Sequence, residues 1–318
     1  MNWLGFILGV LLLLGLDLGL FHRRPRAVGI SEATAWSAGW VALALAFAAA
    51  LFFRRGRETA EAFTTGYLIE LSLSLDNLLV ITLIFAWFRV PAEWRHRVLF
   101  WGILGALALR GLVIGAGTAL IRQFDWVLYL FGAFLLFTGI RMAFSRRPPV
   151  QPETNPVLRL ARRLLPVSPG FAGPKFFTTL DGRLALTPLA LALLLVETSD
   201  LLFAVDSIPA VFSVTRDPFI VFTSNVFAIL GLRWMYFLLA GALDYFRYLK
   251  FGLSVVLIFV GAKMLVEPHG PAPKWFQISI PTGVSLLAIA AILLIAVLLS
   301  VAVSKRGKRA GVAGTTQP

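Results

Sequence analysis

Apolar residues along this chain come in long blocks separated by shorter polar stretches. Each block is about twenty residues long, the length that a helix needs to cross the ~30 Å hydrocarbon core of a bilayer. Nine such blocks occupy approximately residues 2–21, 35–53, 63–88, 98–121, 125–144, 187–213, 218–242, 248–266 and 278–303. The pattern therefore predicts an all-α polytopic membrane protein with about nine transmembrane helices.

The longest polar gap, residues 145–186, is basic and rich in proline. Within it, two short stretches flank Asp181-Gly182, a dipeptide typical of two-residue hairpin turns. We therefore expect a water-exposed loop that carries a small hairpin. The predicted parts of the chain are 1–62 (two helices), 63–144 (three helices), 145–186 (the loop), 187–266 (three helices) and 267–318 (a final helix and a basic tail).

The composition agrees with a membrane protein. Of the 318 residues, 58% are hydrophobic and 14% are charged, whereas about a quarter of the residues in a soluble domain are charged. So few charges cannot cover a water-facing surface, which excludes a cytosolic enzyme. The chain has no cysteine, so disulfides, thiolate metal sites and thiol catalysis are also excluded.

A net charge of +13 raises the question of nucleic-acid binding. The basic residues lie in short runs between the apolar blocks, which is typical of the cytoplasmic loops of membrane proteins. They are concentrated after the first, third, fifth and seventh blocks and in the tail, with Arg54, Arg55 and Arg57 as an exception. We therefore expect no nucleic-acid partner, an N-terminus outside and a cytoplasmic C-terminus. The first block lacks a cleavage site and contains Asp17, so we expect a retained helix rather than a signal peptide.

Two of the apolar blocks contain similar polar residues. Each has two acids six positions apart and a small polar residue directly after the second acid: Glu70, Asp76 and Asn77 in one block, Asp200, Asp206 and Ser207 in the other. The blocks that follow them match at Arg110 and Arg233. Two three-helix units, 63–144 and 187–266, would enter the membrane from opposite sides. Such inverted repeats are typical of secondary transporters, and the alternative is chance similarity between Gly/Ala/Leu-rich helices.

Five acidic residues lie inside the apolar blocks: Glu70, Asp76, Glu197, Asp200 and Asp206. Each costs about 2.5–3.5 kcal/mol at the centre of a bilayer, so their charges must be neutralised. Arg110 and Arg233 lie well inside the blocks and leave an excess of negative charge, which protons or bound cations would balance. Two alternatives stay open. The acids form either a transport pathway or a structural ion-pair network, and the arginines are either counter-ions or participants in gating.

Helix geometry limits which of these side chains share a face. A spacing of six residues turns a helix by about 600°, so Glu70 and Asp76 point about 120° apart. We expect either local unwinding, which Pro209 favours in the second helix, or acids that face different walls of a cavity. The residues that do share a face are Glu70 with Ser74 and Asn77, and Asp200 with Ser207.

The donors available in these helices are carboxylates, amides and hydroxyls, without histidine or cysteine. Such hard oxygen ligands suit Mn²⁺, Mg²⁺ or Ca²⁺ rather than Cu⁺ or Zn²⁺. An anionic substrate would need an excess of arginine, whereas the excess here is negative. Asn225 is either a ligand or an interhelical contact.

Several motifs carry a family resemblance: Gly66-Tyr-Leu-Ile-Glu70, Leu75-Asp-Asn77, Phe124-Asp-Trp126, Phe131-Gly-Ala-Phe-Leu-Leu-Phe-Thr-Gly139, Phe203-Ala-Val-Asp-Ser-Ile-Pro-Ala210 and Thr223-Ser-Asn-Val-Phe-Ala-Ile-Leu-Gly-Leu-Arg233. They resemble the TerC family of membrane proteins, and within it the Alx branch, from the first block to the ninth. The resemblance implies a bacterial inner-membrane protein of manganese homeostasis, related to the LysE superfamily of exporters. Thr198 departs from the aliphatic residue usual in that branch. The acids and amides of the family map onto Glu70, Asp76, Asn77, Glu197, Asp200, Asp206 and Asn225.

We therefore expect secondary-active export of Mn²⁺, with Ca²⁺ and Mg²⁺ as other candidates, driven by proton antiport through some of the same carboxylates. The expected ligands are Glu70, Asp76, Asn77, Glu197, Asp200 and Asp206, with Arg110, Arg233, Asn225, Ser207 and Ser74 in supporting positions. We expect no enzyme, because the Tyr-Asp and Gly-x-Gly-Asp motifs of intramembrane aspartyl proteases do not occur in the chain. The alternative is a membrane scaffold of a metal- or tellurium-stress resistance complex, and the oligomeric state is left open.

Overall fold

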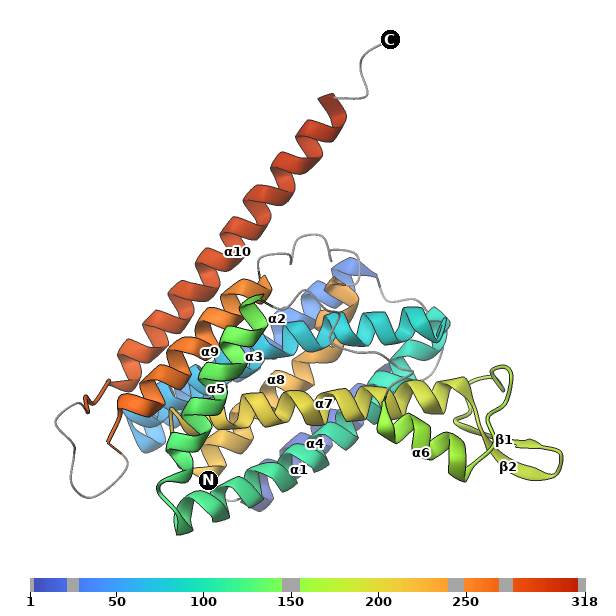
Figure 1. Cartoon of the computed structure of the whole chain (residues 1–318), viewed down its shortest axis with the longest axis horizontal. Helices are drawn as coiled ribbons and strands as arrows, with labels where there is room; N and C mark the ends of the chain where they lie inside the picture. Colours follow the sequence, from blue (N-terminus) through green and yellow to red (C-terminus); the bar gives the residue numbers. More distant parts are fainter. Residues whose placement is uncertain (1–2, 22–28, 145–154, 240–248, 269–276, 314–318) are drawn as a thin grey trace.

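The computed structural model describes residues 3–21, 29–144, 155–239, 249–268 and 277–313 (Figure 1). The described part is almost entirely helical, with one two-stranded sheet. The helices are α1 (Trp3–Phe21), α2 (Ile30–Arg55), α3 (Arg57–Trp87), α4 (Ala92–Gln123), α5 (Val127–Phe144), α6 (Pro156–Leu164), α7 (Pro188–Phe212), α8 (Pro218–Leu239), α9 (Leu249–Val266) and α10 (Thr282–Ala313). The strands are β1 (Phe177–Leu180) and β2 (Arg183–Leu186).

Each of the nine apolar blocks coincides with one of the long helices, α1–α5 and α7–α10. In the described residues, seven of these helices are long and apolar enough to cross a membrane: α2, α3, α4, α5, α7, α8 and α10. The prediction of an all-α polytopic membrane protein is confirmed. The count of nine spans and the division into five parts stay predictions.

The polar loop contains the predicted hairpin. β1 and β2 pair antiparallel, with Leu180 opposite Arg183. Asp181 and Gly182 have φ of 50° and 76°, the left-handed values that a tight two-residue hairpin turn requires. Helix α6 in the same loop was not predicted, because nine residues are too short to produce an apolar block.

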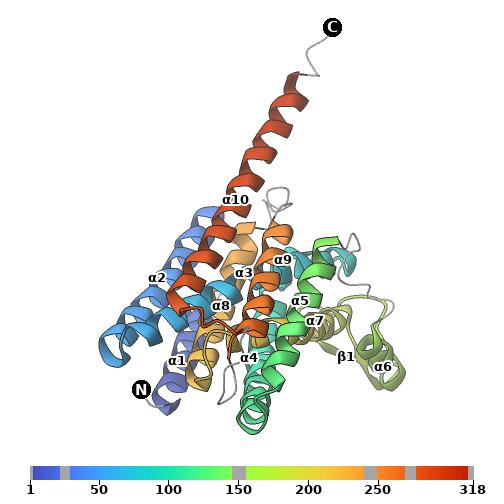
Figure 2. The same ribbon diagram turned by 60° about the vertical axis from the view of Figure 1, so that its left-hand side comes forward.

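The helices of the first predicted three-helix unit pack mainly on those of the second. The most extensive contacts join α5 to α9, α3 to α8, and α4 to α7. Both views show these helices interleaved, while α10 extends beyond the others towards the C-terminus (Figures 1 and 2). Two equivalent units would produce this pairing, although the repeat itself stays a prediction.

The helices that carry the acids are continuous. α3 runs without interruption past Asp76, and α7 continues through Pro209 to Phe212. The expectation of local unwinding is therefore wrong for this conformation, and the alternative of acids facing different walls of one cavity stays a prediction. The reason is geometric, because a regular helix keeps acids six residues apart on different faces.

Candidate functional site

A buried ion-pair cluster lies where α3, α4, α7 and α8 meet. At its centre, the Arg110 guanidinium of α4 forms ion pairs with Glu70 of α3 and Asp200 of α7. Its Nε and Nη2 donate to the two carboxylate oxygens of Asp200 at 3.1 and 2.9 Å, a bidentate arrangement. Its Nη1 donates to Oε1 of Glu70. The three side chains are at most 5% exposed, so the charges must be balanced by one another and by neighbouring polar groups.

Two asparagines bind the same carboxylates. Nδ2 of Asn77 donates to Oδ1 of Asp200 at 3.0 Å, and Nδ2 of Asn225 donates to Oε2 of Glu70 at 2.9 Å. Nη1 of Arg110 also donates to Oδ1 of Asn225 at 3.1 Å. Each carboxylate is thus held by the guanidinium and by one amide, although the two acids lie on different helices.

Helical spacing explains which residues reach this point. Glu70 and Asn77 are seven residues apart in α3, and so are Asp200 and Ser207 in α7. Seven residues make about two turns, so each pair lies on one face, as predicted. Oγ of Ser207 lies 3.4 Å from Nη1 of Arg110, from which it accepts a hydrogen bond. The six residues that we call the Arg110 cluster are Glu70, Asn77, Arg110, Asp200, Ser207 and Asn225.

Two of the predicted ligands lie elsewhere in the bundle. Asp206 is half-buried in α7, where Thr138 of α5 hydrogen-bonds to it. Asp76 is half-buried in α3 and interacts electrostatically with Lys250 of α9. Within the described residues, no three His, Asp or Glu side chains are grouped closely enough to hold a metal ion. The six predicted ligands therefore do not form one site in this conformation.

Glu197 lies one turn before Asp200 on α7 and contacts α4. The carboxylate lies close to Gly105, since a Cβ added to that glycine would collide with it. Oε2 of Glu197 is buried and has no hydrogen-bond partner among the described residues. Burial of a carboxylate oxygen without a partner is costly in free energy, so a bound proton or cation would stabilise this side chain.

Two supporting residues remain from the sequence analysis. Ser74 is buried in α3, and its Oγ has no hydrogen-bond partner in the described part of the chain. Arg233 lies in α8, but its side chain is outside the described residues. Its expected role stays a prediction.

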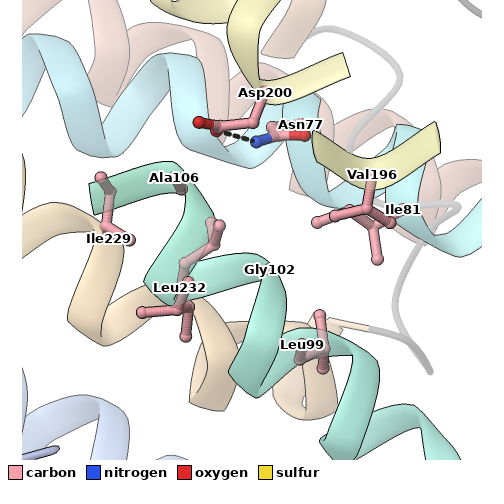
Figure 3. A pocket seen from close by; sticks show the side chains of 10 residues that line it. Asn77, Ile81, Leu99, Gly102, Ala106, Val196, Asp200, Ile229 and Leu232 are labelled. Atoms are coloured by element: carbon pink, nitrogen blue, oxygen red, sulfur yellow. Dashed lines mark hydrogen bonds between the residues drawn. The ribbon is translucent and has the colours of Figure 1, made fainter. Parts of the chain in front are cut away.

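A small cavity borders the Arg110 cluster beside Asn77 and Asp200 (Figure 3). It offers about 20 Å³ to the centre of a water molecule, which is room for about one water. Oδ1 of Asn77 has no hydrogen-bond partner among the described residues. The rest of the lining is apolar and comes from four helices: Ile81, Leu99, Gly102, Ile103, Ala106, Val196, Ile229 and Leu232. A polar species in this cavity would therefore bind at the Asn77–Asp200 pair.

The Arg110 cluster has the charge and the donors of a cation site. Its two carboxylates and one guanidinium carry a formal charge of −1 when all are ionised. Carboxylate, amide and hydroxyl oxygens are ligands that hard divalent cations prefer. In this conformation, the guanidinium occupies the place between the two carboxylates.

Sequence reasoning missed two neighbours of the predicted acids. Thr138 lies in one of the motifs that carry the family resemblance, but no role was assigned to it there, so its contact with Asp206 was not expected. The close approach of Gly105 in α4 to Glu197 was not expected either. A small residue that faces an acid on another helix could have indicated their close approach.

Comparisons with known proteins identify relatives along most of the chain. The profile of the Integral membrane protein TerC family matches residues 55–308. The uncharacterized membrane protein STKORF319 of Myxococcus xanthus is 54% identical over 281 residues, 88% of each chain. A protein named "Putative membrane-bound redox modulator Alx" is 47% identical in Escherichia coli (strain K12), over 89% of this chain and 91% of the relative. The protein of that name in Photorhabdus laumondii is 45% identical over 95% of each chain. No solved structure matches the chain significantly. This chain therefore belongs to the TerC family of integral membrane proteins.

Proposed function

We propose that this protein exports a divalent cation, Mn²⁺ in the first place, across the bacterial inner membrane. The Arg110 cluster is then the empty form of its cation site. The observation that carries the proposal is a buried guanidinium held by acids from two different helices, Glu70 of α3 and Asp200 of α7. These helices belong to the two units that would move against each other in alternating access.

The charges of the cluster favour exchange of Arg110 for a divalent cation. Glu70 and Asp200 together carry −2 when ionised, which a divalent cation neutralises fully and the guanidinium only half. A cation that binds both acids would release Arg110 towards Glu197, one turn from Asp200 and unpaired at Oε2. In the empty site, Arg110 balances part of the carboxylate charge. This stabilises the site, because an unpaired charge is costly within a membrane.

The ligands favour a hard cation. The oxygens of Glu70, Asp200, Asn77 and Ser207 suit Mn²⁺, Mg²⁺ and Ca²⁺ alike, and the resemblance described above favours Mn²⁺ among them. Acids outside the cluster, such as Asp76 and Asp206, are the proposed carriers of protons in the opposite direction. The proposed orientation places the C-terminus in the cytoplasm, where the positive-inside rule locates basic loops.

Two other roles compete with this proposal. The name of the Alx relatives refers to redox modulation. This chain has no cysteine, so a thiol–disulfide route to such a role would require another protein. A membrane scaffold would depend on the loop 145–186 rather than on the buried acids. The transport experiment distinguishes export from both roles, because they do not require cation movement.

The test is uptake of ⁵⁴Mn²⁺ into inverted membrane vesicles that contain the protein. We expect uptake by the wild type and a loss of about 10- to 150-fold in Glu70→Gln and in Asp200→Asn, the factor for losing a charged interaction of about 1.5–3 kcal/mol. The matched control is Asp217→Asn, which removes an acid from an exposed ion pair with Arg55. Uptake equal to empty vesicles in the wild type would overturn Mn²⁺ export, and uptake unaffected by both substitutions would exclude the Arg110 cluster as the site. Competition by unlabelled Ca²⁺ and Mg²⁺ would establish the selectivity.

A second prediction concerns Glu197. Gly105→Ala should displace its carboxylate and lower ⁵⁴Mn²⁺ uptake about tenfold, because the added methyl occupies the space that the carboxylate fills. Stability should change by less than about 1.5 kcal/mol, since the far end of a flexible side chain can move aside. Gly115→Ala in the same helix is the control, because nothing lies within 4 Å of the added Cβ. Equal uptake by the two variants would show that Glu197 takes no part in transport.

A further inference from the structure

Helix α6 is amphipathic and packs on the body of the protein through only part of its apolar surface. Leu158 is 1% exposed and belongs to the apolar core that includes Leu189 in the first turn of α7. On another side of α6, Val157, Leu160 and Leu164 are 38%, 56% and 71% exposed. Their spacing of three and four residues makes them a continuous apolar stripe, and no described residue covers it.

Three arginines adjoin this apolar stripe. Arg159, Arg162 and Arg163 are all exposed on the remaining side of the helix. Within the described residues, none of their guanidinium groups forms an ion pair. Residues 155–186 add Lys175 and Arg183 and contain a single acid, Asp181. This surface therefore combines exposed apolar side chains with an uncompensated positive charge.

Backbone contacts hold α6 at the end of the bundle where α7 begins. The amide of Leu186 donates to the carbonyl of Pro166, and the amide of Ser168 donates to the carbonyl of Leu186, both at 2.8 Å. These bonds tie the segment after α6 to the chain just before α7. Trp94 near the start of α4 contacts Phe171 of the same loop, with ring centroids 5.4 Å apart. Tryptophan is enriched at membrane–water interfaces, so we expect this end of the bundle at the level of the lipid headgroups.

The direction of α6 differs from that of the spanning helices. In Figure 1, α6 runs downward to the right, whereas α4 runs upward to the right, so the two helices differ clearly in direction. A helix at the bundle end that runs across the spanning helices has the direction expected of a helix along the membrane surface.

We propose that α6 is an interfacial helix that binds the anionic phospholipids of the membrane that the protein spans. The stripe of Val157, Leu160 and Leu164 would enter the layer between headgroups and acyl chains, and the arginines would bind lipid phosphates. Basic amphipathic helices bind in this way, through apolar burial together with attraction to negative headgroups. The negatively charged headgroups of such a membrane pair with the arginines, and its acyl layer buries the apolar stripe. Charge complementarity therefore favours an anionic membrane as the binding partner. The inference does not depend on the transported substrate.

The absence of cysteine from the chain allows a direct test with one spin label. The full protein with Leu160→Cys carries a nitroxide and is reconstituted into bilayers of phosphatidylcholine, with or without phosphatidylglycerol. In the anionic bilayer we expect the label to be accessible to oxygen and protected from a water-soluble nickel chelate. A label at Thr179→Cys, exposed in the hairpin, is the matched control that should stay accessible to the chelate.

Substitution of the arginines tests the role of charge. Each arginine contributes about fivefold to binding at an anionic surface, so the triple variant Arg159→Gln/Arg162→Gln/Arg163→Gln should shift the docking equilibrium on the order of a hundredfold. The label at residue 160 would then become accessible to the chelate. The triple variant Arg54→Gln/Arg55→Gln/Arg57→Gln, at the opposite end of α3, removes the same charge and should leave the label protected. A label at 160 that is accessible to the chelate in anionic bilayers, or equally protected with and without the α6 arginines, would overturn the proposal.

Discussion

Replacement of Arg110 by glutamine is expected to lower the free energy of unfolding by about 3–5 kcal/mol, the range for a buried ion pair that loses one partner. Glutamine can still donate hydrogen bonds but cannot balance charge. The carboxylates of Glu70 and Asp200, at most 5% exposed, would then remain without their counter-ion. Denaturant or thermal unfolding of the purified protein in detergent measures the loss.

Two further variants separate the buried charge from a general effect of losing an arginine. Arg55→Gln breaks an ion pair with Asp217 in which the side chains are 33% and 41% exposed, so its cost should be about 0–1 kcal/mol. The double variant Arg110→Gln/Glu70→Gln should be more stable than Arg110→Gln alone, because the second substitution removes one of the two unbalanced charges. If the losses of unfolding free energy in the two single variants simply added in the double variant, the proposed coupling of the two residues would be contradicted.

Substitution of Gly261 by valine is expected to cost more than about 3 kcal/mol or to prevent folding, since overpacking against rigid neighbours exceeds the usual 1–3 kcal/mol. Gly261 lies in α9 where it crosses α5. A Cβ added there would lie 2.6 Å from the amide nitrogen of Leu136 and 2.8 Å from the carbonyl oxygen of Gly132. Both are backbone atoms of α5, so the clash can be relieved only by separating the helices. Unfolding of the purified variant, or its yield in the membrane, measures the effect.

Two glycine-to-alanine substitutions provide a comparison for Gly261→Val. Gly261→Ala should cost about 1–3 kcal/mol, because even one methyl group meets the α5 backbone. Gly39→Ala in α2 makes the same change where nothing lies within 4 Å, and should be neutral or stabilising by up to about 1 kcal/mol. If Gly261→Ala were as stable as the wild type, α5 and α9 would have to lie further apart than in this structure.

Local features of the chain were sufficient for most of the fold. Each apolar block became a helix, because a backbone surrounded by lipid must satisfy its hydrogen bonds internally. The hairpin was predictable from Asp181-Gly182, whose left-handed φ values these residue types tolerate. α6 was missed, although Asn155 accepts hydrogen bonds from the amides of Val157 and Leu158 and Pro156 follows it, which is a recognisable helix start.

The candidate site could be predicted only in part. A charge inside an apolar block is costly wherever the helix packs, so the acids and Arg110 were identifiable from their positions alone. The shared faces of Glu70 with Asn77 and of Asp200 with Ser207 also follow from the period of the helix. No spacing within a helix indicated that Asn225 would bind Glu70, which lies 155 positions away in the chain.

Chain order and side-chain type were thus enough for the helices, the hairpin and the presence of buried charge, because each depends on residues within one element and on the cost of polar groups in lipid. The packing of α3, α4, α7 and α8 determined which of the buried polar side chains contact one another. It placed Arg110 between Glu70 and Asp200 and left Asp76 and Asp206 on other faces of the same helices. The rotation of one helix against another depends on side chains from distant parts of the chain, so it becomes apparent only when the four helices are assembled.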